Sequence, residues 1–405
     1  MTATAHSSDI ETGSPLFWRA TLALCLGSYT IFANLYLTQP LLPMLAQDFD
    51  VSALEAGWSF TVSTLTLGLS LLVYGPLSDA IGRKWLMILS IGGTSLITLL
   101  LSQAQDYSML LWLRGIQGFL MGGLPAIAIA YMGDEFSKKA LMVAVGIYIS
   151  GNTLGGISGR LIGGFVGDWL GWSDAFLAMT LVSVVCLSAF ALLLPNSRQF
   201  KAKPLHPVAM GRDLFSHLRN PLLLTAYLIG GFNFFIFINQ YSYITFVLSD
   251  TPYNLPASLL GMLFLTYLTG TIGSAFSGKI AQHLPQPLVI ALGIGVLMLG
   301  SLVTLSSDLW AIIAGFLLNS FGFFLAHSSA SSWVSRAAPH ARASANSLYL
   351  VFYYLGASCG GFYLDPFWQW AGWRGIVIGS LLVLSCTLVS ALWLYQQDKR
   401  QLQVA

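Results

Sequence analysis

The chain has 405 residues, of which 56% are apolar and only 8% are charged, and its mean hydropathy is +0.72. Soluble globular proteins carry about 25% charged residues, so this composition excludes a protein whose main solvent is water. The net charge of +2 and the lack of a basic run give no indication of nucleic-acid binding. The four cysteines lie in apolar stretches without paired spacing, so we expect no disulfide framework, no metal site and no cofactor.

Apolar stretches long enough to cross a bilayer follow one another along the whole chain. They cover residues 17–44, 53–76, 85–104, 108–132, 140–166, 173–194, 221–248, 257–281, 287–305, 309–333, 343–365 and 374–395. The run that begins at Leu16 is too long for the core of a signal peptide, so we interpret it as a retained first helix. The sequence therefore predicts an all-α membrane protein with twelve transmembrane helices.

The charged residues predict the orientation of these helices. If both termini lie in the cytoplasm, the even-numbered links and the termini hold all but three of the 18 basic residues, the exceptions being Arg114, Arg160 and Arg374. Cytoplasmic segments of membrane proteins carry an excess of lysine and arginine. We therefore expect a multi-pass protein of the cell inner membrane with both termini in the cytoplasm.

A polar stretch divides the chain into two similar halves. The predicted organisation is a cytoplasmic tail (1–15), a six-helix bundle (16–194), a cytoplasmic linker (195–220) with a short amphipathic helix at Met210–Leu218, a second six-helix bundle (221–395) and a cytoplasmic tail (396–405). The segment Leu154–Trp172 aligns without gaps with Leu355–Trp373, a displacement of 355 − 154 = 201 residues. The identical positions include Gly155 and Gly356, Gly159 and Gly360, Gly171 and Gly372, and Trp172 and Trp373. Two repeats with a substrate site between them near the midplane are a common plan among transporters.

The link after the second apolar stretch carries the most specific motif, GPLSDAIGRKW from Gly75 to Trp85. Its charges have a structural interpretation, with Asp79 near a helix N-terminus and Arg83 holding the link in the cytoplasm. Gly75, Asp79, Gly82 and Arg83 also match the signature G-x-L-(small)-D-x-x-G-R-(K/R), and here the chain resembles the major facilitator superfamily.

That resemblance implies a gating latch at the cytoplasmic side. Asp79 would hold the cytoplasmic end of helix 11, Arg83 would bridge to an acid at the end of helix 4, either Asp134 or Glu135, and the latch would break when the protein opens to the cytoplasm. The second half has only a degenerate copy, GKIAQH from Gly278 to His283, so the latch should be one-sided. A purely structural role of these charges is the alternative.

Two further stretches match the same superfamily. Trp112–Gly118 resembles its R-x-x-Q-G element through Arg114 and Gln117. The helix 5 pattern of the drug:proton antiporter branch resembles this chain at Gly146, Gly155, Gly159, Gly163 and Gly164. The chain has Arg160 where that pattern has proline. Glycines at every fourth position form a bare ridge on which another helix backbone can pack. The helix 5 packing residues are Gly146, Gly151, Gly155, Gly159, Gly163 and Gly164.

Ionisable residues inside the apolar stretches are candidates for function, because burying a charge in a membrane is costly. Arg114 and Arg160 are expected in the outer halves of adjacent helices. They either make a positive vestibule for an anionic or strongly polar substrate, or cap carbonyl groups or pair with acids at helix ends such as Asp106 or Asp168.

His327 is the titratable group near neutral pH that lies deep in a span. It either carries the coupling proton or is a neutral histidine bonded to a neighbouring serine. No aspartate or glutamate falls mid-span, and helix 1 has Asn34 where several drug antiporters have an embedded acid. A carboxylate-based proton relay is therefore not expected.

Amides and aromatic residues complete the predicted substrate cavity, since such side chains suit an amphipathic or sugar-like molecule. The predicted cavity residues are Asn34, Arg114, Gln117, Arg160, Asn233, Phe237, Gln240, Tyr241, Asn319, Tyr349 and Tyr353.

These features predict a secondary active transporter that exports a small organic molecule by alternating access, coupled to proton influx. The alternative is uptake or exchange of an organic anion without carboxylate-based proton coupling. A membrane sensor and a membrane-embedded enzyme are less favoured, because no Ser–His–Asp set, H-E-x-x-H helix or phosphate-binding loop occurs. The expected partners are the small-molecule substrate, protons and membrane lipid, without nucleic acid, and the protein is expected to act as a monomer.

Overall fold

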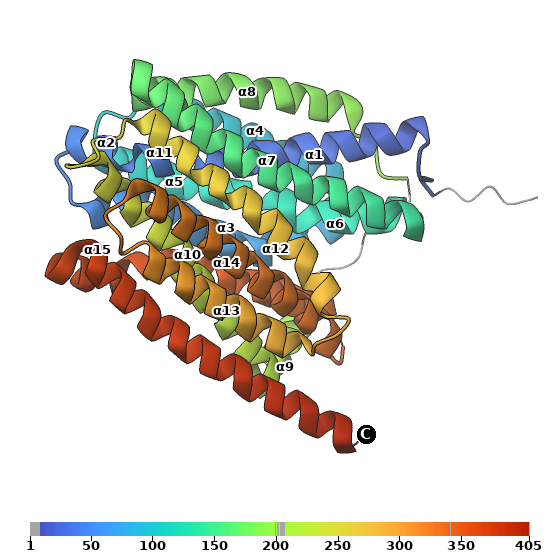
Figure 1. Cartoon of the computed structure of the whole chain (residues 1–405). Coiled ribbons are helices and arrows are strands. Elements are labelled where there is room, and N and C mark those ends of the chain that lie inside the picture. Colours follow the sequence, from blue (N-terminus) through green and yellow to red (C-terminus); the bar gives the residue numbers. More distant parts are fainter. Residues whose placement is uncertain (1–8, 199, 201, 203–206, 341, 405) are drawn as a thin grey trace, which may run out of the picture. The chain divides into compact units, whose positions relative to one another are not determined.

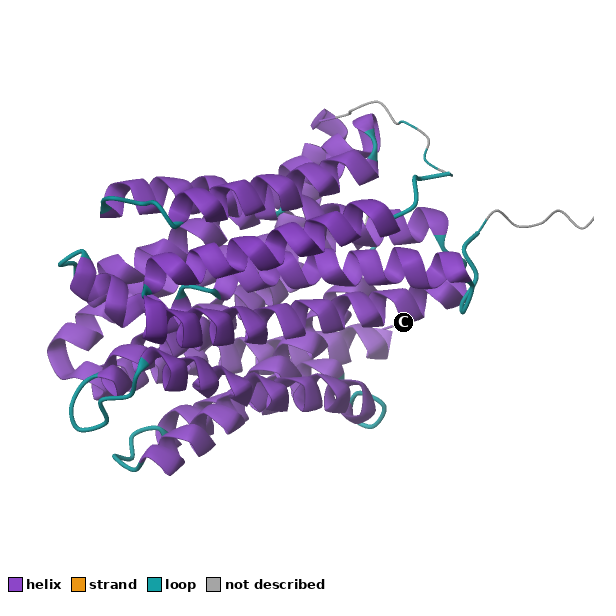
Figure 2. Ribbon diagram, turned by 90° about the horizontal axis from the view of Figure 1, so that it is seen from above, coloured by secondary structure: helices purple, strands orange, loops and turns teal. Residues whose placement is uncertain are grey.

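The structure, a computed structural model, describes residues 9–198, 200, 202, 207–340 and 342–404. Parts of the predicted tails (1–8 and 405) and of the predicted linker (199, 201 and 203–206) lie outside the described residues. Every regular element in the described part is a helix, apart from one isolated bridge between Ile10 and Phe136 (Figure 2). The all-α prediction is confirmed.

The chain divides into two compact units. The first consists of Met1–Thr38 and Leu69–Leu205, and the second of Gln39–Gly68 and His206–Ala405. One long helix, α3 (Ala53–Ile81; labelled in Figure 1), contributes its first half to the second unit and its second half to the first.

The first unit contains long helices joined by short links. They are α1 (Pro15–Tyr36), α4 (Arg83–Leu101), α5 (Tyr107–Met121), α6 (Gly123–Glu135), α7 (Lys138–Leu170) and α8 (Trp172–Leu193), together with the second half of α3. The predicted span 108–132 is realised as α5 and α6, which are separated at Gly122. Ser14, Asp106 and Ser137 each accept a backbone N–H with their side chains and so cap α1, α5 and α7.

The second unit begins with short elements and continues with long helices. They are η1 (Gln39–Leu41), α2 (Leu42–Asp48), the first half of α3, α9 (Pro207–Arg219), α10 (Pro221–Ser249), α11 (Ala257–Leu263), η2 (Phe264–Thr266), α12 (Tyr267–Ile280), α13 (Gln286–Val303), α14 (Leu309–Ala337) and α15 (Arg342–Val404). The amphipathic helix expected in the linker is α9.

The last element, α15, is two helices joined at a sharp break. Ala371 (φ −144°, ψ 19°) and Gly372 (φ 55°, ψ −133°) leave the helical conformation inside it. In the described part of the chain, eleven helices are long and apolar enough to cross a membrane, and the last of these, Ser344–Arg400, contains this break. Dividing it there accounts for the twelve predicted spans.

Glycine permits the same break in both repeats. Gly171, between α7 and α8, has φ 99° and ψ 164°, and its repeat partner Gly372 also has a positive φ. A residue with a Cβ atom rarely adopts these conformations. The glycine identity between the two segments therefore has a backbone cause.

The glycine ridge of α7 packs on the backbone of α1. A Cβ atom at Gly151, Gly155, Gly159 or Gly163 would collide with the carbonyl oxygen of Cys25, Tyr29, Ala33 or Leu37, respectively. These partners also recur at every fourth position, so the two helices touch along a continuous seam. Gly164 is buried as well, whereas a Cβ at Gly146 would meet open space.

The second unit repeats this seam between α15 and α10. A Cβ atom at Gly356 would meet the backbone of Gly231, and one at Gly360 would meet the carbonyl oxygen of Phe235. The glycines are displaced by 201 residues from Gly155 and Gly159, and their partners by 231 − 29 = 235 − 33 = 202 residues from Tyr29 and Ala33. The repeat therefore extends to α1 and α10, whose sequences do not show it.

Candidate functional site

The predicted latch residues of the first unit form an ion-pair cluster. Arg83, the first residue of α4, is 6% exposed; its Nη2 lies 3.0 Å from Asp79 Oδ1, and its Nε donates to Asp134 Oδ2 at 2.6 Å. Gly82 forms the turn before it with φ 109°. Asp79 lies in the last turn of α3, not at the helix N-terminus considered from the sequence, so Arg83 and not a helix dipole neutralises it.

The second acid named for the latch, Glu135, has other partners. Its side chain is 1% exposed, and Oε1 accepts a hydrogen bond from the backbone N–H of Arg198 at 2.8 Å. Its backbone carbonyl accepts from Ile10 N at 2.8 Å. The two adjacent acids therefore have different partners. Asp134 pairs with Arg83, whereas Glu135 is bonded to Ile10, before α1, and to Arg198, after α8.

Arg114, on α5, is completely buried against the end of α1. Its Nη1 donates to the carbonyl oxygen of Asn34 at 3.2 Å and its Nη2 to that of Leu35 at 3.0 Å, and Gln117 Oε1 accepts a further bond from Nη1. Because α1 ends at Tyr36, these carbonyls belong to its last turn, where a positive charge is favourable. Arg114 therefore caps α1 within the apolar part of the unit.

Asn34 and Gln117 extend this cap into a buried network. Asn34 Nδ2 donates to Ser183 Oγ at 2.9 Å, and Asn34 Oδ1 accepts from Thr98 Oγ1 at 2.6 Å. Gln117 Nε2 donates to the same hydroxyl of Thr98 at 2.7 Å. The network joins α1, α4, α5 and α8. Sequence reasoning missed Thr98 and Ser183, because single hydroxyl residues in apolar helices carry no distinctive signal.

Arg160, on α7, approaches the same turn of α1 from another side. It is completely buried, its Nη1 donates to the carbonyl oxygen of Gly156 at 2.9 Å, and its guanidinium lies 3.9 Å from the centre of the Tyr36 ring. Stacking of arginine on an aromatic ring is attractive, especially where water is excluded. The two buried arginines thus meet consecutive residues of α1, namely 34 and 35 for Arg114 and 36 for Arg160.

The amides predicted to line the cavity in the second unit form two separate groups. Gln240 Oε1 accepts from Asn319 Nδ2 at 2.6 Å, and Gln240 Nε2 donates to Ser301 Oγ at 3.0 Å. Asn233 instead accepts from Thr387 Oγ1 at 2.9 Å. The structure brings Gln240 and Asn319 together but not Asn233 with them.

Aromatic rings pack beside the Gln240 pair. Phe237 and Phe323 are stacked with centroids 4.0 Å apart, and Tyr353 stacks on Phe234 at 3.7 Å. The predicted cavity residue Tyr241, one helical turn after Phe237, bonds Thr266 Oγ1 through its hydroxyl at 2.6 Å. These contacts make a continuous aromatic layer in the second unit.

His327 lies at the edge of this layer. Its Nδ1 is 2.9 Å from the hydroxyl of Tyr349, and its ring is 4.7 Å from that of Tyr353. The hydrogen-bond partner of the imidazole is therefore a tyrosine, not the neighbouring serine considered from the sequence. Tyr349 and Tyr353, predicted to share a face, both contact His327.

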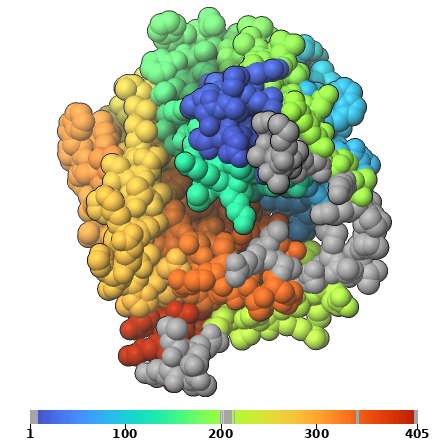
Figure 3. All heavy atoms as spheres, turned by 90° about the vertical axis from the view of Figure 1, so that its right-hand side faces the viewer, coloured from blue at the N-terminus to red at the C-terminus, as the bar shows by residue number. Residues whose placement is uncertain are grey.

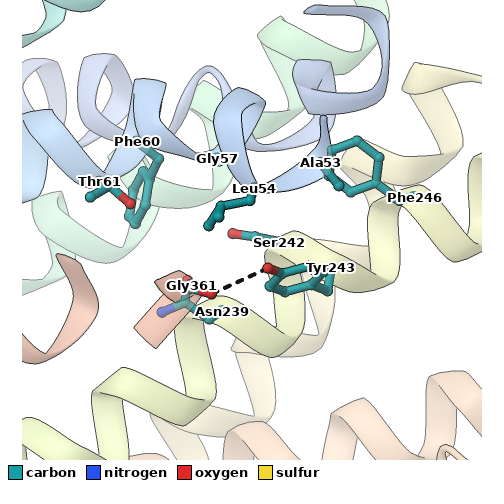
Figure 4. A pocket seen from close by; sticks show the side chains of 10 residues that line it. All are labelled: Ala53, Leu54, Gly57, Phe60, Thr61, Asn239, Ser242, Tyr243, Phe246 and Gly361. Atoms are coloured by element: carbon teal, nitrogen blue, oxygen red, sulfur yellow. Dashed lines mark hydrogen bonds between the residues drawn. The ribbon is translucent and has the colours of Figure 1, made fainter. Parts of the chain in front are cut away.

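A small pocket not predicted from the sequence lies in the second unit, between the first half of α3 and helices α10 and α15 (Figure 4). Tyr243 closes one side by donating its hydroxyl proton to the carbonyl oxygen of Gly361 at 3.3 Å, beside Asn239 and Ser242. Its volume of about 20 Å³ suffices for a water molecule but not for an organic substrate. Among the described residues, no group of three or more histidine, cysteine, aspartate or glutamate side chains is placed to hold a metal ion.

Comparison with known proteins identifies relatives along almost the whole chain. The family model of the Major Facilitator Superfamily matches residues 24–361. The uncharacterized MFS-type transporter YybF of Bacillus subtilis is 36% identical over 385 residues, covering 95% of this chain and 94% of the relative. The inner membrane transport protein YnfM of Escherichia coli is 36% identical over 382 residues, covering 93% and 91%.

A solved structure shares the fold. The inward-facing, unoccupied structure of a bacterial homologue of the human lysosomal transporter Spinster aligns with a TM-score of 0.73 at 16% identity, covering 94% of this chain and 96% of that one. At this identity the likeness concerns the fold alone.

Proposed function

Because this chain belongs to the Major Facilitator Superfamily, and is therefore a multi-pass membrane transporter, we propose that it exports a small organic molecule by alternating access, coupled to proton influx. The observation that carries the proposal is the repeated seam of α1 with α7 and of α10 with α15. Two bundles built on one plan can rock as bodies and expose a site to each side in turn. The two predicted six-helix bundles, 16–194 and 221–395, would be these bodies.

Export is supported by the helix 5 glycines, which follow the pattern of the drug:proton antiporter branch. Three of these pattern glycines, Gly155, Gly159 and Gly163, are in close contact with the α1 backbone, so the pattern has a packing function in this chain. Arg160 replaces the proline of that pattern and adds a buried positive charge one residue from the seam. We propose that the exported molecule is anionic or carries strong hydrogen-bond acceptors that Arg160 recognises.

Arg114 has a different role in this proposal. Its guanidinium already donates to two carbonyl oxygens and an amide oxygen, so it holds the end of α1 in place and only indirectly supports the site. Arg160 is then the substrate contact that we propose in the first unit, and the aromatic layer around Phe237 is the one that we propose in the second. Amides and aromatic rings with a single strong charge suit an amphipathic anion.

Uptake or exchange of an organic anion is the second candidate. It is favoured by the two buried arginines and by the lack of a mid-span acid in the sequence. Counterflow in proteoliposomes separates the two candidates, because an exporter coupled to protons accelerates under an imposed pH gradient, whereas an exchanger responds only to substrate on the opposite side.

Gating is assigned to the Asp79–Arg83–Asp134 cluster. Asp79 and Asp134 are partly exposed, at 43% and 35%, while Arg83 between them is buried. A buried arginine shared by two acids can change partners without losing all of its pairing, which suits a contact that forms and breaks in each cycle.

A thermal-shift screen tests the substrate site. Purified protein is screened against classes of organic anions, amphipathic cations, sugars and neutral drugs, in parallel with Arg160→Gly and with Arg336→Gly, an exposed arginine of α14. An anion that stabilises the parent and the Arg336 variant but not the Arg160 variant supports the proposal. If every stabilising compound acts equally on all three proteins, Arg160 is a scaffold residue.

Proton coupling through His327 is tested by the pH dependence of transport, once a substrate is found. His327→Ala should flatten the pH profile of transport, because it removes the imidazole that would carry the coupling proton. Tyr349→Phe, which keeps the ring and removes the hydroxyl bonded to Nδ1, should shift the profile without abolishing it. An unchanged profile in His327→Ala removes this residue from the coupling mechanism.

A further inference from the structure

Residues 9–11, here called the N-terminal strap, are bound to the turn between α6 and α7. Ile10 N donates to the carbonyl oxygen of Glu135 at 2.8 Å, and Ser137 N donates to the carbonyl oxygen of Ile10 at 3.2 Å, which makes a parallel bridge. The side chain of Ile10 is 4% exposed, and Ser137 Oγ donates to Glu11 Oε2 at 3.0 Å. Figure 3 shows the N-terminal part of the described chain, which includes these residues, in dark blue beside teal-green atoms of the first unit.

The first residues of the linker are held by the same end of α6. Arg198 N donates to Glu135 Oε1 at 2.8 Å, and Tyr131, one turn earlier on α6, donates its hydroxyl proton to the carbonyl oxygen of Pro195 at 2.9 Å. Glu135 therefore binds the strap through its main chain and the linker through its side chain. Buried carboxylates are stable only when they are hydrogen-bonded, so these contacts fix the rotamer of Glu135 and the last turn of α6.

Asp134, the neighbour of Glu135, holds Arg83. Partly exposed ion pairs contribute little by themselves, because ordering two long side chains offsets most of their attraction. The net attraction of such a pair is larger when the backbone already holds one partner in position, because less conformational entropy is then lost on pairing. Here the backbone of residue 134 is placed by the strap and the linker, which are bonded to the next residue.

We propose that Glu135 is a positioning residue for the gate: by anchoring the N-terminal strap and the linker, it keeps Asp134 in reach of Arg83 and so stabilises the state closed to the cytoplasm. The proposal rests on the gating role of the Arg83–Asp134 pair given above. Without these anchors the last turn of α6 frays, Arg83 loses one of its two acids, and the state open to the cytoplasm becomes more populated.

Thiol labelling of a cysteine at position 150 tests this directly. Ser150 is an exposed residue of α7, in the half of that helix nearest the strap. In a cysteine-free background, Ser150→Cys is labelled by a membrane-impermeant thiol reagent in sealed vesicles that expose the cytoplasmic face. The variants are Asp134→Asn, removal of residues 2–11, Ile10→Gly as a milder change, Glu135→Leu, and Glu135→Gln, whose amide oxygen still accepts the bond from Arg198 N.

We expect Asp134→Asn to raise the labelling rate about tenfold, and strap removal and Glu135→Leu to raise it about fivefold, as a loss of one or two hydrogen bonds implies for a two-state equilibrium. Glu135→Gln should remain within about twofold of the parent. Combining Asp134→Asn with strap removal should add nothing further, because both act through the same pair.

Different results would overturn the gating role of the Arg83–Asp134 pair and the positioning role of Glu135. If Asp134→Asn leaves the labelling rate at the parental value, the gating role of the pair is wrong. If Asp134→Asn raises the rate while strap removal, Ile10→Gly and Glu135→Leu do not, the gate stands and Glu135 does not position it. Lower thermal stability of these variants at an unchanged labelling rate likewise shows that the strap is only structural, and a fully additive double variant shows that it acts elsewhere.

Discussion

The seam between α1 and α7 predicts a sharp contrast between two glycines of one helix. At Gly159 a Cβ atom would lie 2.6 Å from the Cα of Ala33, whereas ordinary van der Waals contact begins at 3.4–4 Å, and the obstacle is backbone that cannot rotate away. At Gly146 nothing lies within 4 Å of the same atom. Gly159→Ala therefore forces the helices apart by about 1 Å, and Gly146→Ala does not.

The difference in stability between the two variants can be estimated, because both substitutions share one contribution to the free energy of unfolding. Both replace glycine by alanine inside a helix, which favours the folded state by about 1 kcal/mol. Only Gly159→Ala adds overpacking, about 1–3 kcal/mol. The difference between the variants is thus the overpacking term itself. With about 3 °C per kcal/mol for a unit of this size, Gly159→Ala should melt about 3–9 °C below Gly146→Ala.

The assay is thermal unfolding of the purified protein in detergent, followed by the monodisperse fraction that remains after heating. Gly360→Ala in the second repeat, where a Cβ would meet the carbonyl oxygen of Phe235, should behave like Gly159→Ala. Equal melting temperatures for Gly159→Ala and Gly146→Ala would refute the seam as described here.

Two other substitutions test the backbone break and the buried network by the same assay. Gly171→Ala places a side chain at φ 99°, ψ 164°, and should destabilise the protein by about 1–3 kcal/mol. Thr98→Val removes the hydroxyl that joins Asn34 to Gln117 and leaves two buried polar groups unsatisfied, which should destabilise it by about 1–3 kcal/mol. Thr153→Val, at a partly exposed position of α7, is its control and should melt with the parent. If it melts with Thr98→Val, the loss is a general effect of replacing a hydroxyl by a methyl group and not of the network.

Periodicity and hydropathy predict much of this fold, because a transmembrane helix needs a long apolar run and little else. The spans follow from the sequence in this way, and the break at Gly372 falls in the link expected between spans 343–365 and 374–395. The division of the fourth span at Gly122 does not, since glycine inside an apolar run is equally compatible with a continuous helix. The change of α3 from one unit to the other depends on contacts with α10 and α15 that are distant in sequence.

The candidate site was less predictable, for a physical reason. An arginine in an apolar run must be satisfied, but the sequence does not say whether by substrate, acid or carbonyl. Arg114 is satisfied by the last turn of α1, and only the path of that helix past α5 shows it. Similarly, Asp134 and Glu135 are equivalent candidates in the sequence. The structure shows that Asp134 pairs with Arg83, whereas the side chain of Glu135 accepts a hydrogen bond from Arg198 N.

The central claim, that two repeated bundles move as bodies, is tested most directly by distances between spin labels on the two units. Exposed positions at the predicted cytoplasmic side are Lys139 on α7 and Arg336 on α14. With both replaced by labelled cysteines in liposomes, the distance distribution should contain at least two populations whose ratio changes with pH or on adding a stabilising ligand. One narrow distance that stays the same under all these conditions would contradict transport by alternating access.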